Sequence, residues 1–541
     1  MLLEFARFGG ANLALHPLLL PDGSGVDSRN CSPDRGDLRP MSAPLTVHTL
    51  PLTTAQTIYR MGRTAPSDTN YWFAWSADVD VARGFVAEDT SERTFWSGDG
   101  VPKWTDNSIG LGAAPYPDSS GVRILGVPKP NATPGLTETV AGSGTDESRA
   151  YVVVWVNDRG EPSMPSTAVT ITCKPGATIQ VARNATVPVG AYGLAKWRVY
   201  RTVAGNDEDY FFCGEALAAT ATLDTTDGML NAADVLQSED WAMPPSNLKG
   251  LKVLWGGMLV GFVGKALCFC EPLYPFAWPV RYQIPLDSDI VGLARVGLSL
   301  VVLTVNQPYV LTGSNPEAMT PQAVDFNQAC LSKRGIVEHG HGVSWPSPDG
   351  LCYMGADGTR GVLTASIATR DDWQGLEPAT IVAGDDEGRY VGSYLVGGTR
   401  KSFVLNPLAP ADGFRFCDSG FVACFRDPIG DAFYVLQPGN TGAVQRWDDG
   451  ATLTASFKSK VSRVSRPTNF AFAQVLADSY PVTLSLWADG AAVLTGYSVA
   501  NGDGFRLPGG FLADQWQFQI QTTVPVQQLL LAHSADELRQ A

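Results

Sequence analysis

A strict alternation of glutamine and large apolar residues near the end of the chain constrains its fold more than any other feature. Residues 515–521 have the sequence Gln-Trp-Gln-Phe-Gln-Ile-Gln, and residues 482–487 alternate in the same way. A period of two places Trp516, Phe518 and Ile520 on one face of a strand and the glutamines on the other. This pattern recurs along the chain whereas helical periodicity is rare, so we predict an all-β protein.

Size, composition and charge fit a large β-protein with several domains. The 541 residues exceed one ordinary hydrophobic core, so two to four domains are expected. The 56 glycines and 37 prolines supply the tight turns that many short strands require. The net charge of −15 argues against a surface that grips a nucleic acid backbone, because such surfaces concentrate lysine and arginine.

The cysteines and the apolar segments indicate where the protein is made. The nine cysteines form no tight framework, and Glu4 and Arg7 interrupt any apolar signal-peptide region, so we expect synthesis in a reducing cytoplasm. The longest apolar run, residues 251–270, is broken by Lys252 and Lys265. We therefore expect no membrane-spanning segment.

A β-propeller is expected from meander-like runs of strands. The first fifty residues have a loop-like composition, and three apolar runs between residues 57 and 106 indicate one antiparallel meander, the unit of a propeller blade. Residues 1–128 are therefore assigned to an N-terminal arm and the first propeller part. Residues 241–450 are assigned to the remaining blades, because their strand runs recur about forty residues apart. Several stacked β-sandwiches are the alternative.

Two further regions are predicted to be β-sandwiches. Residues 129–240 are assigned to an inserted sandwich of the fibronectin-III or immunoglobulin type, because residues 151–156 are apolar on both faces and include a tryptophan. Residues 451–541 are assigned to a C-terminal sandwich with a short terminal helix. Ser534 and Glu537 have the spacing of a capping box at the start of that helix.

Four stretches of the chain carry a family resemblance. They are residues 9–12 leading into 36–40, residues 71–75 to 95–105, residues 151–162, and residues 469–481 continuing through 505–510. Together they resemble the nozzle, or tail tubular protein B-like, proteins of short-tailed (podovirus) bacteriophages. The resemblance implies a β-propeller with sandwich insertions that assembles as a six-fold ring at the end of the tail.

The resemblance also implies function, partners and location. It implies a structural virion protein of the tail, not an enzyme, made in the host bacterial cytoplasm. Its ring would continue the DNA channel below the portal and adaptor proteins, with tail fibre, spike or needle proteins around or below it. Double-stranded DNA would pass through without specific binding. No catalytic residue is transferred, because none is known for the family pattern, and no cofactor-binding or metal-binding residue is predicted.

A histidine pair is the best sequence candidate for a metal site. His339 and His341 would lie on the same side of a strand, near Glu338 and the turn at Asp349. Zinc sites with a strong sequence pattern need more ligands, such as two cysteine pairs. An exposed blade edge is therefore the favoured interpretation, and no metal is predicted.

Several short motifs have a simpler explanation than a binding site. The cysteine pair at 268–270 has one intervening residue, whereas redox motifs have two, so buried strand residues are expected. Residues 257–265 lack the first glycine of a phosphate loop. The Arg-Gly-Asp tripeptide at 35–37 is ordinary turn chemistry. The glycosylation sequons at Asn131 and Asn184 mean little without a secretory signal.

The alternative function is a carbohydrate-binding or glycan-hydrolysing propeller of the tail, involved in host-surface recognition. Carboxylates crowd three regions, namely Asp78, Asp80, Glu88 and Asp89, then Asp371 and Asp372, and finally Asp385, Asp386 and Glu387. A glycosidase needs two of them ~5–9.5 Å apart across a sugar, and solvated turns are the commoner explanation. Trp104, Trp373 and Trp516 would stack on sugars if exposed, although Trp516 already fits a core.

Overall fold

The computed structural model describes residues 2–32, 35–61, 71–85 and 89–540, and strands dominate it. The described α-helices are short, α1 (Arg370–Gln374) and α2 (Ala535–Gln540), and neither is long and apolar enough to cross a membrane. The position of α2 confirms the predicted terminal helix. The chain divides into two compact units, residues 1–60, 294–310 and 323–541, and residues 61–293 and 311–322.

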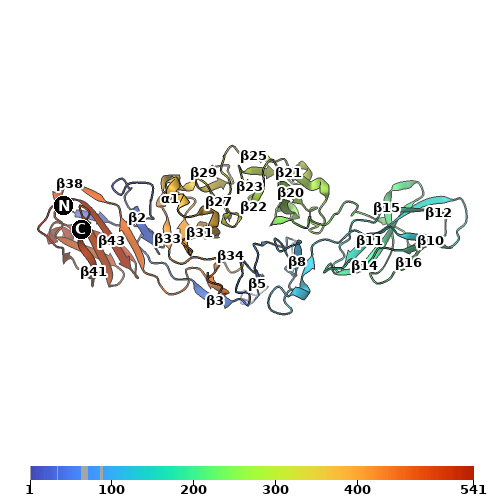
Figure 1. Ribbon diagram of the computed structural model, residues 1–541, viewed down its shortest axis with the longest axis horizontal. Coiled ribbons are helices and arrows are strands. Elements are labelled where there is room, and N and C mark those ends of the chain that lie inside the picture. Colours follow the sequence, from blue (N-terminus) through green and yellow to red (C-terminus); the bar gives the residue numbers. More distant parts are fainter. Residues whose placement is uncertain (1, 33–34, 62–70, 86–88, 541) are drawn as a thin grey trace. The chain divides into compact units, whose positions relative to one another are not determined.

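The described residues contain six groups of four neighbouring strands, which are blades of a β-propeller (Figure 1). The first three are β6 (Asp80–Arg83), β7 (Thr94–Ser97), β8 (Lys103–Thr105) and β9 (Arg123–Ile124); β18 (Lys249–Val253), β19 (Leu259–Val263), β20 (Ala266–Phe269) and β21 (Gln283–Pro285); and β22 (Ile290–Val296), β23 (Ser299–Thr304), β24 (Tyr309–Thr312) and β25 (Gln322–Ala323). The others are β26 (Val337–His339), β27 (Gly342–Ser347), β28 (Gly350–Gly355) and β29 (Arg360–Val362); β30 (Val382–Asp386), β31 (Arg389–Val396), β32 (Thr399–Leu405) and β33 (Arg415–Cys417); and β34 (Ala423–Asp427), β35 (Ala432–Leu436) and β36 (Ala443–Arg446) with β3 (Leu45–Thr49).

This strand order confirms the predicted propeller. In five blades all four strands are consecutive in sequence and neighbours in the sheet, and in the sixth β3 from the N-terminal region pairs with β36 beside the consecutive strands β34 to β36. Stacked sandwiches would instead cross between sheets. The first blade lies later in the chain than expected. The apolar runs near residues 60 and 73 form β4 (Thr57–Arg60) and β5 (Trp72–Trp75), outside that blade. The polar strand β6 had no apolar run to reveal it.

The inserted sandwich is confirmed between the first and second blades of the sequence. One sheet contains β10 (Gly135–Val140), β13 (Thr178–Ala182) and β16 (Thr222–Thr225), and the other contains β12 (Val169–Cys173), β11 (Glu147–Asn157), β14 (Leu194–Val203), β15 (Asn206–Leu217) and β17 (Asn231–Val235). Residues 151–156 are all buried in β11, as their apolar character on both faces predicts. Trp155 pairs with Trp197 of β14, and both are buried.

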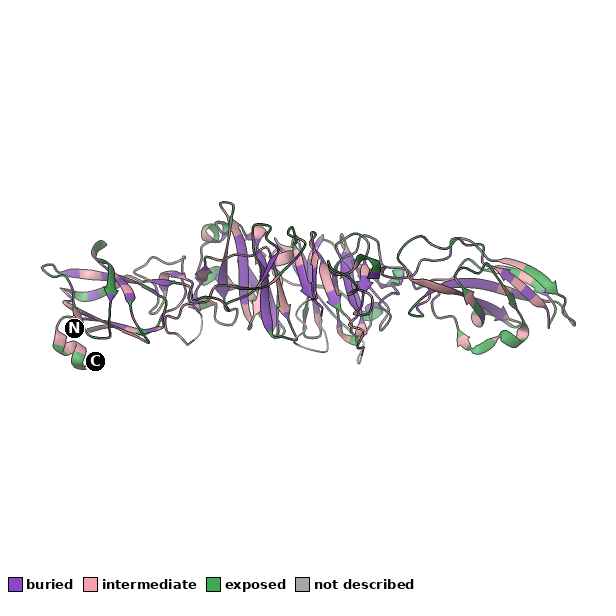
Figure 2. Cartoon of the chain, turned by 90° about the horizontal axis from the view of Figure 1, so that it is seen from below, coloured by how far each residue is buried: buried purple, intermediate pink, exposed green. Residues whose placement is uncertain are grey.

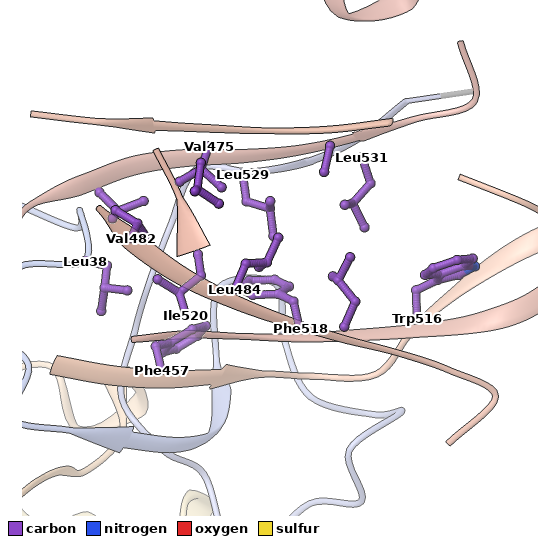
Figure 3. Packing of buried hydrophobic residues seen from close by; sticks show 14 of the residues in the cluster. Leu38, Phe457, Val475, Val482, Leu484, Trp516, Phe518, Ile520, Leu529 and Leu531 are labelled. Atoms are coloured by element: carbon purple, nitrogen blue, oxygen red, sulfur yellow. The ribbon is translucent and has the colours of Figure 1, made fainter. Parts of the chain in front are cut away.

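The C-terminal sandwich is also confirmed. It contains β37 (Ala455–Ser459), β38 (Ser462–Thr468), β39 (Phe472–Ala477), β40 (Val482–Ala488), β41 (Ala491–Val499), β42 (Phe505–Arg506), β43 (Ala513–Thr522) and β44 (Val526–Ala532). Trp516, Phe518 and Ile520 of β43 are buried, as their alternation predicts, and they pack with Leu484 of β40 and Leu529 of β44 (Figure 3). Figure 2 shows the same concentration of buried residues along the strands.

The first fifty residues are mostly loops, as predicted, but they also contain three short strands that the prediction missed. β1 (Leu2–Phe5) pairs with β44, and β2 (Gly25–Arg29) pairs with β37 and with β33 of a propeller blade. Phe8 lies in the core of the C-terminal sandwich, edge-on to Phe457. These strands have four or five residues each, and their partners lie hundreds of residues away, so local periodicity did not reveal them.

Candidate functional sites

His339 belongs to a hydrogen-bonded relay that joins two propeller blades. Its Nδ1 lies 2.6 Å from an Asp385 carboxylate oxygen, and its Nε2 lies 3.1 Å from the Ser344 hydroxyl. His339 ends β26 and Ser344 lies in the neighbouring β27, whereas Asp385 lies in β30 of the following blade. The relay was not predicted, because only the fold brings Asp385 to His339. The predicted neighbours of the histidines were Glu338 and the turn at Asp349.

Hydrogen bonds join a serine, a histidine and an aspartate here in the order that they have in the catalytic triad of a hydrolase. A nucleophile must reach the substrate, however, and the side chain of His339 and the whole of Ser344 have no exposed surface. The relay therefore satisfies buried polar groups and holds neighbouring blades together. The prediction that His339 lies at an exposed blade edge is wrong.

His341 does not complete a metal site with His339. Its ring is stacked on that of His339 with the centroids 5.4 Å apart. Burial and the neighbouring imidazole lower the pKa of His341, and Asp385 only partly opposes this, which favours the neutral form of the ring. Within the described part of the chain, no three His, Cys, Asp or Glu side chains are grouped to hold a metal ion.

The third carboxylate cluster forms the turn between β30 and β31. At the end of the antiparallel β30–β31 pair, Asp385 lies opposite Tyr390 and Asp386 lies opposite Arg389. Burial, together with the nearby Glu387 carboxylate, raises the pKa of Asp386 to about 6, and Arg426 at 3.2 Å opposes this. An acid with this pKa is a common feature of catalytic sites, but here its nearest partner is a structural arginine.

The other carboxylate clusters also serve local structure. Asp372 forms a capping box with Thr369 at the start of α1, and Asp80 accepts a hydrogen bond from the Gly250 amide at 2.8 Å. Asp89 accepts one from the Ser91 amide at 2.9 Å. Glu88 lies outside the described residues. Asp372, Asp80 and Asp89 are thus each engaged in a local contact.

The three tryptophans considered as sugar platforms are buried. Trp104, Trp373 and Trp516 each expose 1% or less of their surface. The Trp104 ring packs under the Arg93 guanidinium at 4.0 Å, and the Trp373 indole donates a hydrogen bond to the Ser347 carbonyl at 2.8 Å. Trp104 and Trp373 are therefore not exposed for stacking, whereas the burial of Trp516 agrees with its expected place in a core.

Among the cysteines of the chain, Cys268 and Cys270 are confirmed as buried residues. All nine are free, and all but Cys424 are buried. Burial raises the pKa of Cys268 to about 11 and that of Cys270 to about 12. Because the thiolate is the reactive form, neither thiol is a nucleophile near neutral pH.

The remaining short motifs have structural roles. In the Arg-Gly-Asp tripeptide, Gly36 has a φ of 83°, and Asp37 pairs with Arg39 at 2.9 Å, as expected for a turn. The two glycosylation sequons bind each other: the Asn131 side-chain amide donates to the Thr186 hydroxyl at 2.9 Å, and the Thr186 amide donates back at 3.1 Å. Residues 257–265 contain strand β19 and the residues just before and after it, and so do not form a phosphate loop.

A buried ion pair joins the first blade to the inserted sandwich and borders a cavity of about 400 Å³. Arg93 donates to both carboxylate oxygens of Glu161, at 2.5 and 3.2 Å, and both side chains are 9% exposed. Phe95, Phe276 and Arg159 also line the cavity. No local pattern indicates this pair, since its members lie 68 residues apart in the chain.

Comparison with known proteins adds little to this description. No family model matches the chain, and no curated protein matches it. Solved structures similar to the chain include the Pan2 WD40 domain of Neurospora crassa, with 7% identity over 50% of this chain and 85% of that one and a TM-score of 0.27. BamB of Moraxella catarrhalis is 12% identical over 59% of this chain and 96% of that one, with a TM-score of 0.26. At such low TM-scores, the propeller assignment follows from strand order alone.

Proposed function

We propose that this chain is a structural virion protein that forms the tail nozzle ring of a short-tailed phage. The ring would continue the DNA channel below portal and adaptor proteins and allow the genome to leave. The arrangement of domains carries this proposal: propeller blades, a sandwich inserted between the first and second blade, and a C-terminal sandwich. This is the architecture that the family resemblance implies.

The state of the polar side chains supports a structural role over the carbohydrate alternative. Asp385 binds His339, Asp372 caps a helix and Glu161 binds Arg93. The tryptophans named for sugar stacking are in cores. The groups that a sugar-cleaving propeller would use are thus engaged in holding sheets and blades together.

The charge of the chain supports passage of DNA without binding. Its 54 acidic and 39 basic residues repel a phosphate backbone at short range, within a screening length of ~8 Å at physiological salt. A basic lining would retain DNA by releasing counterions. Replacing channel-lining Asp or Glu residues with Lys should therefore slow genome ejection without blocking assembly. Unchanged ejection kinetics would refute repulsion as the reason for the charge.

Negative-stain imaging of the purified chain tests the proposal most directly. Annular or tapered particles with six-fold symmetry are expected, because a closed ring joins one face of each copy to a different face of its neighbour. A glycan array and a reducing-sugar assay on bacterial surface polysaccharide cover the alternative. A chain that stays monomeric at every concentration and releases sugar would overturn the nozzle assignment.

A further inference from the structure

β41 is the last strand of the largest sheet, and one of its two edges is open. It pairs antiparallel with β40 along one side. No strand among the described residues pairs with its other side, because the order of the sheet ends β43-β40-β41. An open edge presents unpaired main-chain amide and carbonyl groups, on which another strand can assemble.

The sequence of β41 does little to protect this edge. Natural edge strands are shielded by lysine or other charges, by proline, by shortness or by bulges. β41 has nine residues, Ala-Ala-Val-Leu-Thr-Gly-Tyr-Ser-Val, with no charge and no proline. Its pairing with β40 shifts register on either side of Leu486, so bulges are the one device present. Most of its side chains are exposed, including Tyr497 at 40%.

The net negative charge of the chain lies outside the sandwich that contains β41. Residues 1–60 and 451–541, which include all strands of the C-terminal sandwich, contain eleven basic and eleven acidic residues. The whole net charge of −15 thus lies in residues 61–450. Identical copies repel each other through that acidic part, whereas the sandwich that holds β41 carries no net charge.

We propose that the open edge of β41 pairs with a strand of a second copy of this chain. The contact is a main-chain ladder, so it needs no charged or large side chain on β41. It rests on the proposed nozzle only in assuming that several copies share one particle. The neutral sandwich is then the interface, and the acidic part remains free to face DNA.

Lysine substitutions on the edge test this contact. Thr495→Lys and Ala492→Lys place a charge at exposed positions of β41, which is how natural edges prevent pairing. Thr137→Lys is the matched control, because Thr137 is an exposed residue of the edge strand β10, which already carries Glu138. Mass photometry would follow the oligomer over a range of concentrations, and circular dichroism would confirm that each variant is folded.

The dissociation constants of the variants show whether β41 forms the contact between copies. Either β41 variant should raise the dissociation constant of the oligomer about tenfold or more, equivalent to ~1.4 kcal/mol, while Thr137→Lys leaves it unchanged. Amides of residues 491–499 should also exchange more slowly with deuterium in the assembled wild type than in Thr495→Lys.

Six-membered rings that form equally well in all variants would overturn the β41 contact but would leave the nozzle proposal intact. Association through β41 into dimers or fibres alone would support the contact and overturn the nozzle, and a monomeric wild type would overturn the contact.

Discussion

At the scale of single residues, the imidazole of His339 connects two blades through the Asp385 carboxylate at 2.6 Å and the Ser344 hydroxyl at 3.1 Å. His339→Ala should lower the free energy of unfolding by about 2–4 kcal/mol, because it leaves a cavity and removes the partner of the buried Ser344 hydroxyl and of the part-buried Asp385 carboxylate. Urea denaturation measures this. His341→Ala is the control, since the His341 Nε2 has no hydrogen-bond partner. Equal losses in both variants would contradict a special role for the relay.

Asp386 should make stability depend on pH. Its pKa is raised to about 6 in the folded chain, from 3.8, so the folded state holds the proton more tightly than the unfolded state. Stability therefore falls as pH rises from about 4 to about 6, and the loss is complete above that range. Asp386→Asn should stabilise the chain by about 2 kcal/mol at pH 7.5, and should have no such effect below about pH 4.

The control for Asp386 shares its arginine. Asp431 also pairs with Arg426, but its side chain is 87% exposed. Asp431→Asn should change stability by less than about 1 kcal/mol, with little dependence on pH in this range. A gain in Asp386→Asn that persists at pH 4 would show that its cause is not the carboxylate charge.

Single-residue environments were predictable from sequence only where the pattern is local. The alternation of residues 515–521 predicted the buried face of β43, and the apolar runs around Cys268 and Cys270 predicted buried thiols. The partner of His339 is 46 residues away on another blade, so no spacing rule could identify it. The same holds for the burial of Trp104 and Trp373, whose immediate neighbours in sequence are partly polar.

At the scale of elements, the Arg93–Glu161 pair holds the first blade to the inserted sandwich. Glu161→Gln should lower the free energy of unfolding by about 3–5 kcal/mol, because it leaves a buried guanidinium without its countercharge. The double variant Arg93→Met/Glu161→Met should recover most of this loss, since both charges are then absent. Differential scanning calorimetry would measure both variants.

A surface pair within the inserted sandwich provides the comparison. Glu215 accepts hydrogen bonds from Lys196 at 2.8 Å and from Arg198 at 3.1 Å, and is 39% exposed. Glu215→Gln should change stability by no more than about 1 kcal/mol. If it is as damaging as Glu161→Gln, burial does not explain the importance of the Arg93 pair.

Elements were predictable where apolar runs are long or alternate strictly. The blades between residues 249 and 446, the buried strand β11 and the alternating strand β43 follow from such runs. The strands β1, β2 and β3 were missed, because each is short and is specified by partners from the opposite end of the chain. Pairing over such separations depends on the tertiary fold, which local propensity does not encode.

At the scale of the whole molecule, the charge of −15 should make self-association depend on salt. Raising the ionic strength from ~0.01 M to ~0.1 M shortens the screening length from ~30 Å to ~10 Å. Repulsion between the acidic parts of neighbouring copies then falls, so the dissociation constant should decrease. Analytical ultracentrifugation across this range measures the effect. An assembly that weakens as salt rises would show that attraction between opposite charges, not a neutral interface, joins the copies.

The pairing of Leu2–Phe5 with Leu529–Ala532 has a consequence for biosynthesis. That sheet stays unfinished until the ribosome has released its last strand, although its first strand was made some five hundred residues earlier. The inserted sandwich needs only residues 135–235 and can fold while translation continues. We therefore expect pulse-chase proteolysis of nascent chains to find the middle of the polypeptide protected well before its two extremities.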